Sequence, residues 1–306
     1  MLTSHDHFDI LKSGVSNWNK WREVNTTVAP HLRGTDLREA NLRGADLREA
    51  DLRGADLEQA YLAGAVLTGA NLGKARLHSA HLAGAHLGKI FLGGANLEGA
   101  YLAGAYLAGA YLAKARLAGA TFRGAVLRGA DLRGADLRGG DLAGANLREA
   151  FLGGAAYNAA SMGTAYLGGA DLRGADLRGA DLEQAHCAGA NLGGTHLEGA
   201  NLGKTHFCSA DLGGAYLTRA HLEGAHLAGA NLWGAHLEGA DLSNVKSFYK
   251  AILDPGILSE IKTRWPEKLA TILDIGLMSW VIDEVLLKQL KSPDWQGWPE
   301  KEYHGK

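Results

Sequence analysis

Nine histidines in this 306-residue chain occupy one recurring place, directly before a large apolar residue. They are densest toward the carboxyl end, where His186, His206 and His226 follow one another at twenty-residue intervals. Imidazole nitrogens bind zinc when several ligands converge on one ion. The sequence adds no cluster of cysteine and carboxylate to complete such a set. If twenty residues make one coil, these histidines form a stacked ladder with a pH-dependent surface charge. That interpretation is favoured, and a metal-binding protein is the weaker alternative.

Asp or Asn stands at the same place in nineteen other repeats, from Asp36 to Asp241. Paired carboxylates can act as general acid and base, but here one group recurs along the whole chain and no pair is singled out. Short polar side chains at bends commonly bond to nearby backbone, which favours a structural role. No phosphate loop or nucleophile elbow stands out, so we expect neither an enzyme nor a cofactor.

Arginines occur in two blocks, each arginine at the position directly after a recurring large apolar residue, usually Leu. Such basic blocks could contact phosphate. The blocks consist of Arg33, Arg38, Arg43, Arg48 and Arg53, and of Arg123, Arg128, Arg133, Arg138 and Arg148. Acids such as Asp46, Asp51, Asp131 and Asp136 are interleaved with both blocks. Because residues on either side of Leu project the same way, each Arg has an acid nearby. We expect a self-neutralising surface and no direct binding of nucleic acid.

Aromatic residues replace the polar ones within residues 91–113, where Glu98 is the only charge. Phe91, Tyr101, Tyr106 and Tyr111 take the outward place there, and we call these four the aromatic belt. An uncharged belt on a charged surface is a candidate site for a protein partner. The alternative is that these rings stack on other rings of this protein and need no partner. The residues leave both interpretations open.

All these residues belong to a five-residue phrase that runs without a gap through residues 30–244. The phrase is small, polar, leucine, variable and usually glycine, as in residues 170–174, Ala-Asp-Leu-Arg-Gly. Of 43 pentads, 38 have Leu at the centre and 37 have Ala at the small position. Gly ends 28 of them, and it can adopt a positive φ where the chain must bend.

A period of five fits neither a helix nor a long strand. Leu at every fifth residue would spiral around a helix, whereas strand alternation needs a period of two. Within one pentad, Ala and Leu can point to one side and the residues around them to the other. Short extended pieces joined by regular bends form a coil, and stacked coils bury a ladder of Leu and Ala. The pattern therefore predicts a solenoid.

These repeats resemble the pentapeptide-repeat family, whose consensus is Ala-Asp/Asn-Leu-x-x, over about 70% of the chain. The resemblance implies an all-β solenoid, a right-handed quadrilateral parallel β-helix with four pentads to a coil. On that geometry, 43 pentads make between ten and eleven coils, which span roughly 50 Å at the usual spacing of strands.

Composition and charge set further expectations. The formal net charge is −2 and the pI is near 6.7, so no strong attraction to nucleic acid or anionic membrane is expected. The amino terminus lacks the pattern of a secretory signal, and no membrane span is expected. Cys187 takes an inward position and Cys208 an outward one, so a disulfide is not expected. This usage suits a reducing cytoplasm.

Both ends of a solenoid need caps, since each exposes unpaired strand edges. Residues 1–29 are expected to form a helical cap, with Phe8, Leu11, Val15 and Trp18 as the stripe of an amphipathic helix. Residues 245–306 are expected to be partly helical and to act as a cap or as a homodimer contact. The apolar face of the last expected helix consists of Met278, Val281, Ile282, Val285, Leu286 and Leu290.

Residues 156–164 are irregular, since Tyr157 and Met162 replace Leu and glycine leaves the bends. A bulge or a widened coil is expected there, and a functional notch is the alternative.

The leading hypothesis is a non-enzymatic scaffold that presents repetitive faces to a protein partner, because a rigid rod has no converging cleft. The resemblance also raises a DNA-mimicking protein that binds or protects a type II topoisomerase such as DNA gyrase. Nearly balanced charge counts against that alternative, as do uninterrupted pentads, which leave no projecting loop.

Overall fold

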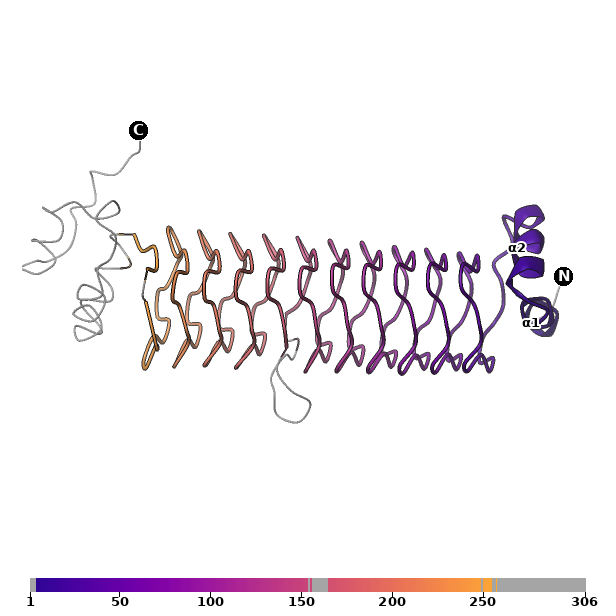
Figure 1. Ribbon diagram of the computed structural model, residues 1–306, viewed down its shortest axis with the longest axis horizontal. Coiled ribbons are helices and arrows are strands. Elements are labelled where there is room, and N and C mark those ends of the chain that lie inside the picture. The colour runs from indigo at the N-terminus through magenta and orange to yellow at the C-terminus, as the bar shows by residue number, and fades with distance from the viewer. Residues whose placement is uncertain (1–3, 154, 156–164, 249, 255–256, 258–306) are drawn as a thin grey trace, which may run out of the picture.

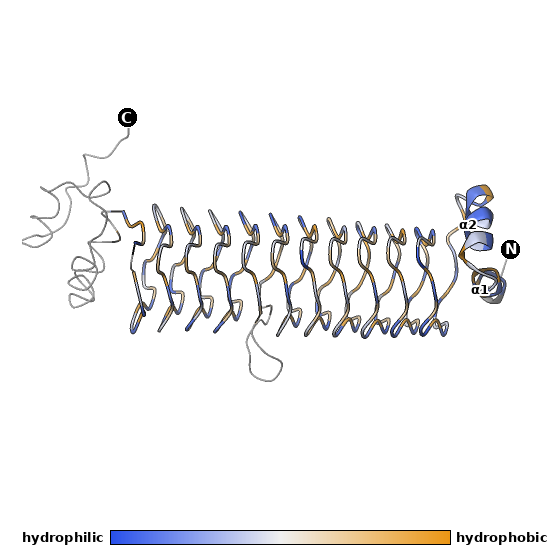
Figure 2. Ribbon diagram, viewed as in Figure 1, coloured by the Kyte–Doolittle hydropathy of each residue, from blue (hydrophilic) through white to orange (hydrophobic). Residues whose placement is uncertain are grey.

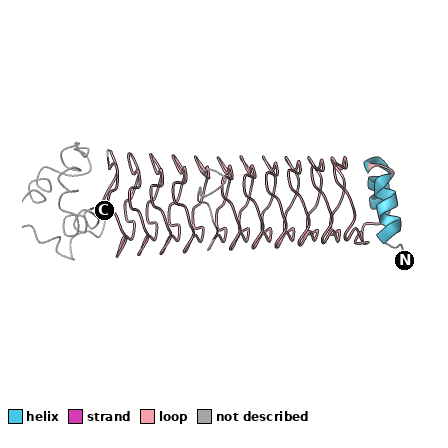
Figure 3. Ribbon diagram, turned by 90° about the horizontal axis from the view of Figure 1, so that it is seen from below, coloured by secondary structure: helices cyan, strands magenta, loops and turns pink. Residues whose placement is uncertain are grey.

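The described part of the chain forms a long rod with two short helices at its amino end (Figure 1). The computed structural model describes residues 4–153, 155, 165–248, 250–254 and 257. Helix α1 spans Ser4–Lys12 and helix α2 spans Val15–Val24. Figure 3 draws the coils without strand arrows, because each pentad contributes a single bridging residue.

Successive coils pair through parallel bridges between residues twenty positions apart. His31 bridges Asp51, and Asp36 bridges Asp56. The next two pentads repeat this spacing, so four pentads complete one turn. The outward residue of each described pentad consequently stands in one of four columns that run along the rod.

One coil contains 25 residues instead of twenty. Asp141 bridges Tyr166 across this coil, and the interval of twenty then resumes. The amide of Asp181 donates a hydrogen bond to the carbonyl of Ala155, so the five extra residues lie between Ala155 and Ala165. One pentad therefore exceeds the four sides of this coil, although the pentads run without a gap in the sequence, and the expectation that they leave no loop concerns residues outside those described. The bulge or notch expected at 156–164 lies outside the described residues.

We name the four columns after their first residues. The His31 column contains His31, Asp51, Asn71, Phe91, Tyr111, Asp131, Phe151, Asp176, His196, Tyr216 and His236. The Asp36 column contains Asp36, Asp56, Arg76, Asn96, Arg116 and Asp136, followed beyond residue 164 by Asp181, Asn201, His221 and Asp241. The Asn41 column contains Asn41, Tyr61, His81, Tyr101, Thr121, Asp141, Tyr166, His186, His206, His226 and Ser247. The Asp46 column contains Asp46, Val66, His86, Tyr106, Val126, Asn146, Asp171, Asn191, Asp211, Asn231 and Ile252.

Every backbone amide of a typical pentad has an acceptor. In residues 131–135, three amides donate to carbonyls of the adjacent coils at 2.7–3.1 Å. The amide of Ala135 closes the bend by donating to the carbonyl of Leu132 at 2.9 Å. The remaining amide, that of Arg133, donates to Oδ1 of Asp131 at 3.1 Å. Asp and Asn therefore complete the backbone bonding, which is the structural role expected for them.

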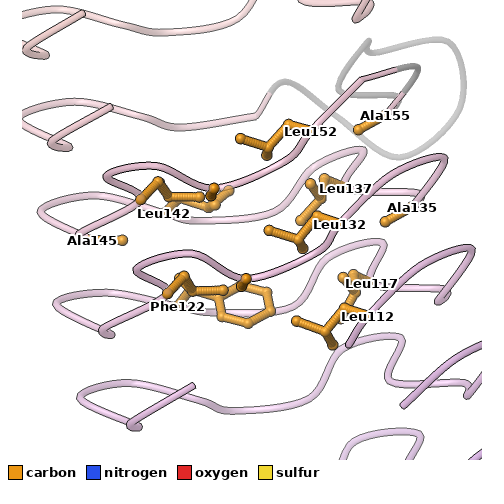
Figure 4. Packing of buried hydrophobic residues seen from close by; sticks show 14 of the residues in the cluster. Leu112, Leu117, Phe122, Leu132, Ala135, Leu137, Leu142, Ala145, Leu152 and Ala155 are labelled. Carbon is orange, nitrogen blue, oxygen red and sulfur yellow. The ribbon is translucent and has the colours of Figure 1, made fainter. Parts of the chain in front are cut away.

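The interior holds a ladder of Leu and Ala (Figure 4). Leu132 is fully buried and Leu172 is 1% exposed. Each such side chain contributes about 1.5–3 kcal/mol on burial. Two threonines at small positions, Thr195 and Thr205, are also buried, and their hydroxyls donate to backbone carbonyls at 2.9 and 2.8 Å. Figure 2 shows polar and apolar residues mixed within every coil, as alternate inward and outward positions require.

The amino segment forms two helices rather than one continuous stripe. Gly14 separates them with a φ of 114°, a value that L side chains rarely adopt. Trp18 in α2 is fully buried over the first coils, and its Nε1 donates to the carbonyl of Asp46 at 2.8 Å. Asn19 donates to the carbonyl of Gly44 at 3.0 Å and accepts from the amide of Asp46 at 2.9 Å. Helix α2 thus bonds to backbone at the end of the rod.

The coil continues past residue 244, where the sequence places its end. His226 bridges Ser247 and Asn231 bridges Ile252, each at an interval of 21. One extra residue has entered the coil, and this shift ends the regular rhythm in the sequence. Val245 and Phe248 are nonetheless buried, at 5% and 7% exposure.

Candidate functional site

The aromatic belt wraps around three of the four columns. Phe91 and Tyr111 belong to the His31 column, Tyr101 to the Asn41 column and Tyr106 to the Asp46 column. All four side chains are about half exposed. A flat partner surface can contact one column or two adjacent ones, so it cannot cover the whole belt.

Each belt residue in these columns stacks on a ring one coil away. Phe91 stacks on Tyr111 with ring centroids 4.6 Å apart and an interplanar angle of 8°. Tyr101 stacks on His81 at 4.9 Å and Tyr106 on His86 at 5.6 Å. Stacking between coils is therefore present without any partner. The exposed ring edges remain available, because stacking covers only the ring faces.

The longest set of rings lies in the Asn41 column beyond the 25-residue coil. Tyr166 stacks on His186 at 5.1 Å, and His186 on His206 at 4.6 Å. His206 stacks in turn on His226 at 4.5 Å. The sequence predicted that the three histidines stack. It did not predict which residue of the preceding coil lies next to Tyr166 in the same column. A twenty-residue interval would have placed Tyr166 above Asn146, not above Asp141.

A groove of about 560 Å³ runs beside the three histidines. It is lined by Gln184, His186, Lys204, His206, Glu223, Gly224, His226, Asn244 and Lys246. Burial lowers the pKa of His206, and the neighbouring histidines His226 and His186 lower it further. Parallel rings keep their nitrogens from converging on one ion. Among the described residues, no group of three or more His, Cys, Asp or Glu side chains is arranged to hold a metal.

Most arginines of the two blocks bind carboxylates of this chain. Within single pentads, Arg38 pairs with Asp36 at 2.6 Å and Arg133 with Asp131 at 2.7 Å. Hydrogen bonds from Arg38 lower the pKa of Asp36 to about 2. Between coils, Arg128 pairs with Glu149 at 3.1 Å. These contacts fit the expected self-neutralising surface.

A second groove of about 520 Å³ opens beside Tyr111, the last residue of the belt along the chain. It is lined by Lys89, Gly109, Ala110, Tyr111, Gly129, Asp131, Arg133 and Phe151. Tyr111, Asp131 and Phe151 are successive members of the His31 column. The sequence analysis did not single out Phe151, although it repeats the outward aromatic signal forty residues beyond Tyr111.

A family model of pentapeptide repeats matches the chain in eight copies. They cover residues 31–62, 60–99, 90–129, 100–139, 125–156, 165–202, 185–224 and 220–254. The chain belongs to the pentapeptide-repeat family. The right-handed quadrilateral β-helix of that family agrees with the four columns seen here.

Solved pentapeptide-repeat proteins resemble this member of the family. HetL, involved in heterocyst differentiation regulation in the cyanobacterium Nostoc sp. strain PCC 7120, is 36% identical over 76% of this chain and 95% of its own, with a TM-score of 0.41. A pentapeptide-repeat protein of the Arabidopsis thaliana thylakoid lumen is 31% identical over 40% and 68%, with a TM-score of 0.22. QnrB1, a plasmid-mediated fluoroquinolone resistance protein, is 18% identical over 78% and 98%, with a TM-score of 0.32. A comparison with curated proteins finds no match.

The remaining sequence expectations concern cysteines, membranes and the carboxyl segment of this pentapeptide-repeat protein. Cys187 is buried and Cys208 is partly exposed, and both are free thiols. Among the described residues, no helix is long and apolar enough to cross a membrane. The six apolar residues proposed for a cap or dimer helix, from Met278 to Leu290, lie outside the described residues.

Proposed function

We propose that this pentapeptide-repeat protein is a non-enzymatic scaffold that binds a protein partner through the rings of its outward columns. The observation that carries the proposal is the half-exposed set of rings on a rigid rod. Its members with large exposure are Phe91, Tyr101, Tyr106, Tyr111, Phe151, Tyr166 and Tyr216. Tyr, Trp and Phe are enriched in protein interfaces because they bury much area at little entropic cost.

Backbone bonding supports this proposal. An Asp at the outward place accepts the amide two residues on, as Asp131 does for Arg133. The ring of a Tyr or Phe cannot accept that bond. A belt of aromatic residues therefore gives up a local hydrogen bond that the family consensus supplies, which is expected where the rings serve another purpose.

The test is quantitative capture from the native host with the wild-type chain and a double variant, Tyr101→Ser and Tyr106→Ser. These residues lie in adjacent columns, so one partner can contact both. Loss of a captured protein supports the scaffold. The matched control is Arg116→Ser and His221→Ser in the Asp36 column, which should leave capture unchanged. Equal capture by both variants removes the belt from the interface.

Self-association is a second mode of partner binding, which we place in the carboxyl segment. Because the described coil continues to Ile252, a truncation should begin after Ile257 and not after residue 244. A homodimer that becomes a monomer on removal of residues 258–306, measured by light scattering, supports this assignment. A cytoplasmic location is proposed as well, because both cysteines are free and suit a reducing compartment.

Protection of a type II topoisomerase is the second candidate function. The 25-residue coil weakens one argument against it, namely that uninterrupted pentads leave no projecting loop, because this coil holds five residues more than its four sides need. The paired charges disfavour it, because a DNA mimic needs unneutralised acid along the rod. A gyrase supercoiling assay with a quinolone decides between the two. Retained supercoiling in the presence of this protein would establish the second function, and unchanged inhibition would remove it.

A further inference from the structure

The His31 column carries rings on alternate coils along part of its length. Its consecutive members there are Tyr111, Asp131, Phe151, Asp176 and His196. Below this part, Phe91 and Tyr111 stack directly at 4.6 Å, and above it His196 and Tyr216 stack at 4.7 Å. Asp131 therefore interrupts the ladder of rings, since the coils before and after its own carry Tyr111 and Phe151 in the same column.

The gap at Asp131 has the thickness of one ring. Rings stacked on adjacent coils of the outward columns have centroids 4.5–5.6 Å apart. Tyr111 and Phe151 are two coils apart, which corresponds to about 9–10 Å at the usual spacing of strands. A planar ring placed midway would meet both at the distance at which this protein stacks its own rings.

We propose that the coil of Asp131 is a binding slot for an aromatic side chain of the protein partner, next to an acidic residue of that partner. The inference rests on the proposed scaffold function and names the chemistry that one of its contacts recognises. The inserted ring would complete the ladder from Phe91 to Phe151, with a face covered by Tyr111 and the other by Phe151. Stacked pairs of this kind contribute beyond their buried area.

The slot is open at the corner of the rod. The bends beside it end in Gly109 and Gly129, at φ values of 65° and 64°, and neither bears a side chain that could cover the opening. Asp131, at the base of the slot, is held in place because Arg133 donates two hydrogen bonds to its carboxylate, of 2.8 and 2.7 Å. The carboxylate is therefore fixed beside its own arginine, and both residues line the groove.

The charge around the slot determines which partner residue is favoured next to the inserted ring. Asp131 and Arg133 neutralise each other, and Arg128 pairs with Glu149 on the next coil. Lys89 adds a net positive charge, and its side chain runs over the adjacent bend, where a Cβ on Gly109 would lie 3.7 Å from its Cγ. A similar gap lies at Asp176, between Phe151 and His196 in the same column. Lys89 lines the groove at Asp131 and so distinguishes the two gaps. An Asp or Glu beside the inserted ring would be attracted to it.

The probe is a library of random twelve-residue peptides displayed on phage and selected against the full-length protein. Enriched peptides are expected to contain Trp, Tyr or Phe with Asp or Glu within two residues. Affinities of the synthesised peptides are then measured by fluorescence anisotropy. Replacing the peptide's aromatic residue by Leu should weaken binding about tenfold, the size typical of an anchor residue.

The decisive variant is Asp131→Tyr, which fills the slot with a ring from the chain itself. It should weaken the peptides at least about tenfold, because their aromatic residue loses its place. The matched control is Thr121→Tyr, which adds a ring above Tyr101 in the Asn41 column and should leave affinity unchanged. Lys89→Gln should weaken binding less and reduce its dependence on salt. Unchanged circular dichroism melts would show that both Tyr variants fold.

Three results would overturn the slot. These are peptides without aromatic residues, equal binding to wild type and Asp131→Tyr, and displacement by N-acetyltryptophan at the peptide's own concentration, which would indicate a small aromatic acid as ligand. The scaffold function is judged separately by Tyr101→Ser and Tyr106→Ser. If that double variant loses its partner while Asp131→Tyr binds peptides normally, the scaffold stands and the slot is wrong.

Discussion

The indole of Trp18 donates a hydrogen bond of 2.8 Å to the carbonyl of Asp46, 28 residues further along the chain. This bond joins α2 to the first coil of the rod. Arg22, one helical turn on, is also buried and donates to the carbonyls of Val28 and Arg48 at 2.6 and 3.2 Å. Helix α2 thus covers the apolar end of the solenoid and bonds to backbone carbonyls there.

Substituting Trp18 by Ala should destabilise this end of the rod. The loss of a fully buried indole costs about 3–5 kcal/mol. Hydrogen exchange should accelerate at Leu47 and the neighbouring coil, while amides beyond residue 200 should be unaffected. Trp233→Ala is the matched control, since that side chain is 52% exposed and its removal should cost less than about 0.5 kcal/mol. Similar effects of the two substitutions would contradict the capping role of α2.

The amino cap should loosen in mild acid. Burial is the main cause that lowers the pKa of His7 from its ordinary value of 6.5, and the nearby His31 lowers it further. The unfolded segment therefore binds a proton more readily than the folded one. The contribution to stability is complete above about pH 6.5 and is lost as the pH falls through the lower folded pKa. Protection factors of amides in α1 and α2, corrected for intrinsic exchange and measured between pH 7.5 and 5, should fall more in wild type than in His7→Gln. Identical profiles would refute the assignment to His7.

Substituting Leu132 by Ala should lower the free energy of unfolding by about 2–5 kcal/mol, because a cavity opens in a thin core. Leu132→Met keeps most of the volume and should cost less than about 1.5 kcal/mol. Urea denaturation followed by circular dichroism measures both. Comparable costs for the two variants would mean that Leu132 does not pack against adjacent coils.

The inward and outward positions of the rod could be predicted from sequence. Leu must be buried in every pentad, and an interval of twenty correctly predicted that His206 stacks on its neighbours and Tyr111 on Phe91. Those predictions depend only on the five-residue period and on the four-sided coil that the family resemblance supplied. Local chemistry also predicted that outward Asp and Asn side chains bond to nearby backbone, as Asp131 does by accepting from the amide of Arg133.

The register across the 25-residue coil could not be predicted in the same way. An insertion of one whole pentad leaves every later Leu on the five-residue count, so no change appears in the pattern. Only the lateral pairing shows that Tyr166 lies above Asp141. The end of the coil was missed for the opposite reason, because one extra residue before Phe248 ended the rhythm without ending the coil. The slot at Asp131 needed both the columns and the measured stacking distances.

The assignment of residues to columns is the central claim, because every surface described above depends on it. It is tested most directly by disulfide formation in Phe151→Cys with Asp176→Cys, 25 residues apart, in a Cys208→Ser background. Burial raises the pKa of the remaining Cys187 to about 12, so that thiol should not react.

Bridged residues in parallel strands have Cα atoms close enough for a disulfide. Mass spectrometry should find this pair oxidised and the pair of Phe151→Cys with Asp171→Cys, twenty residues apart, reduced. Oxidation of the second pair and not the first would contradict the columns.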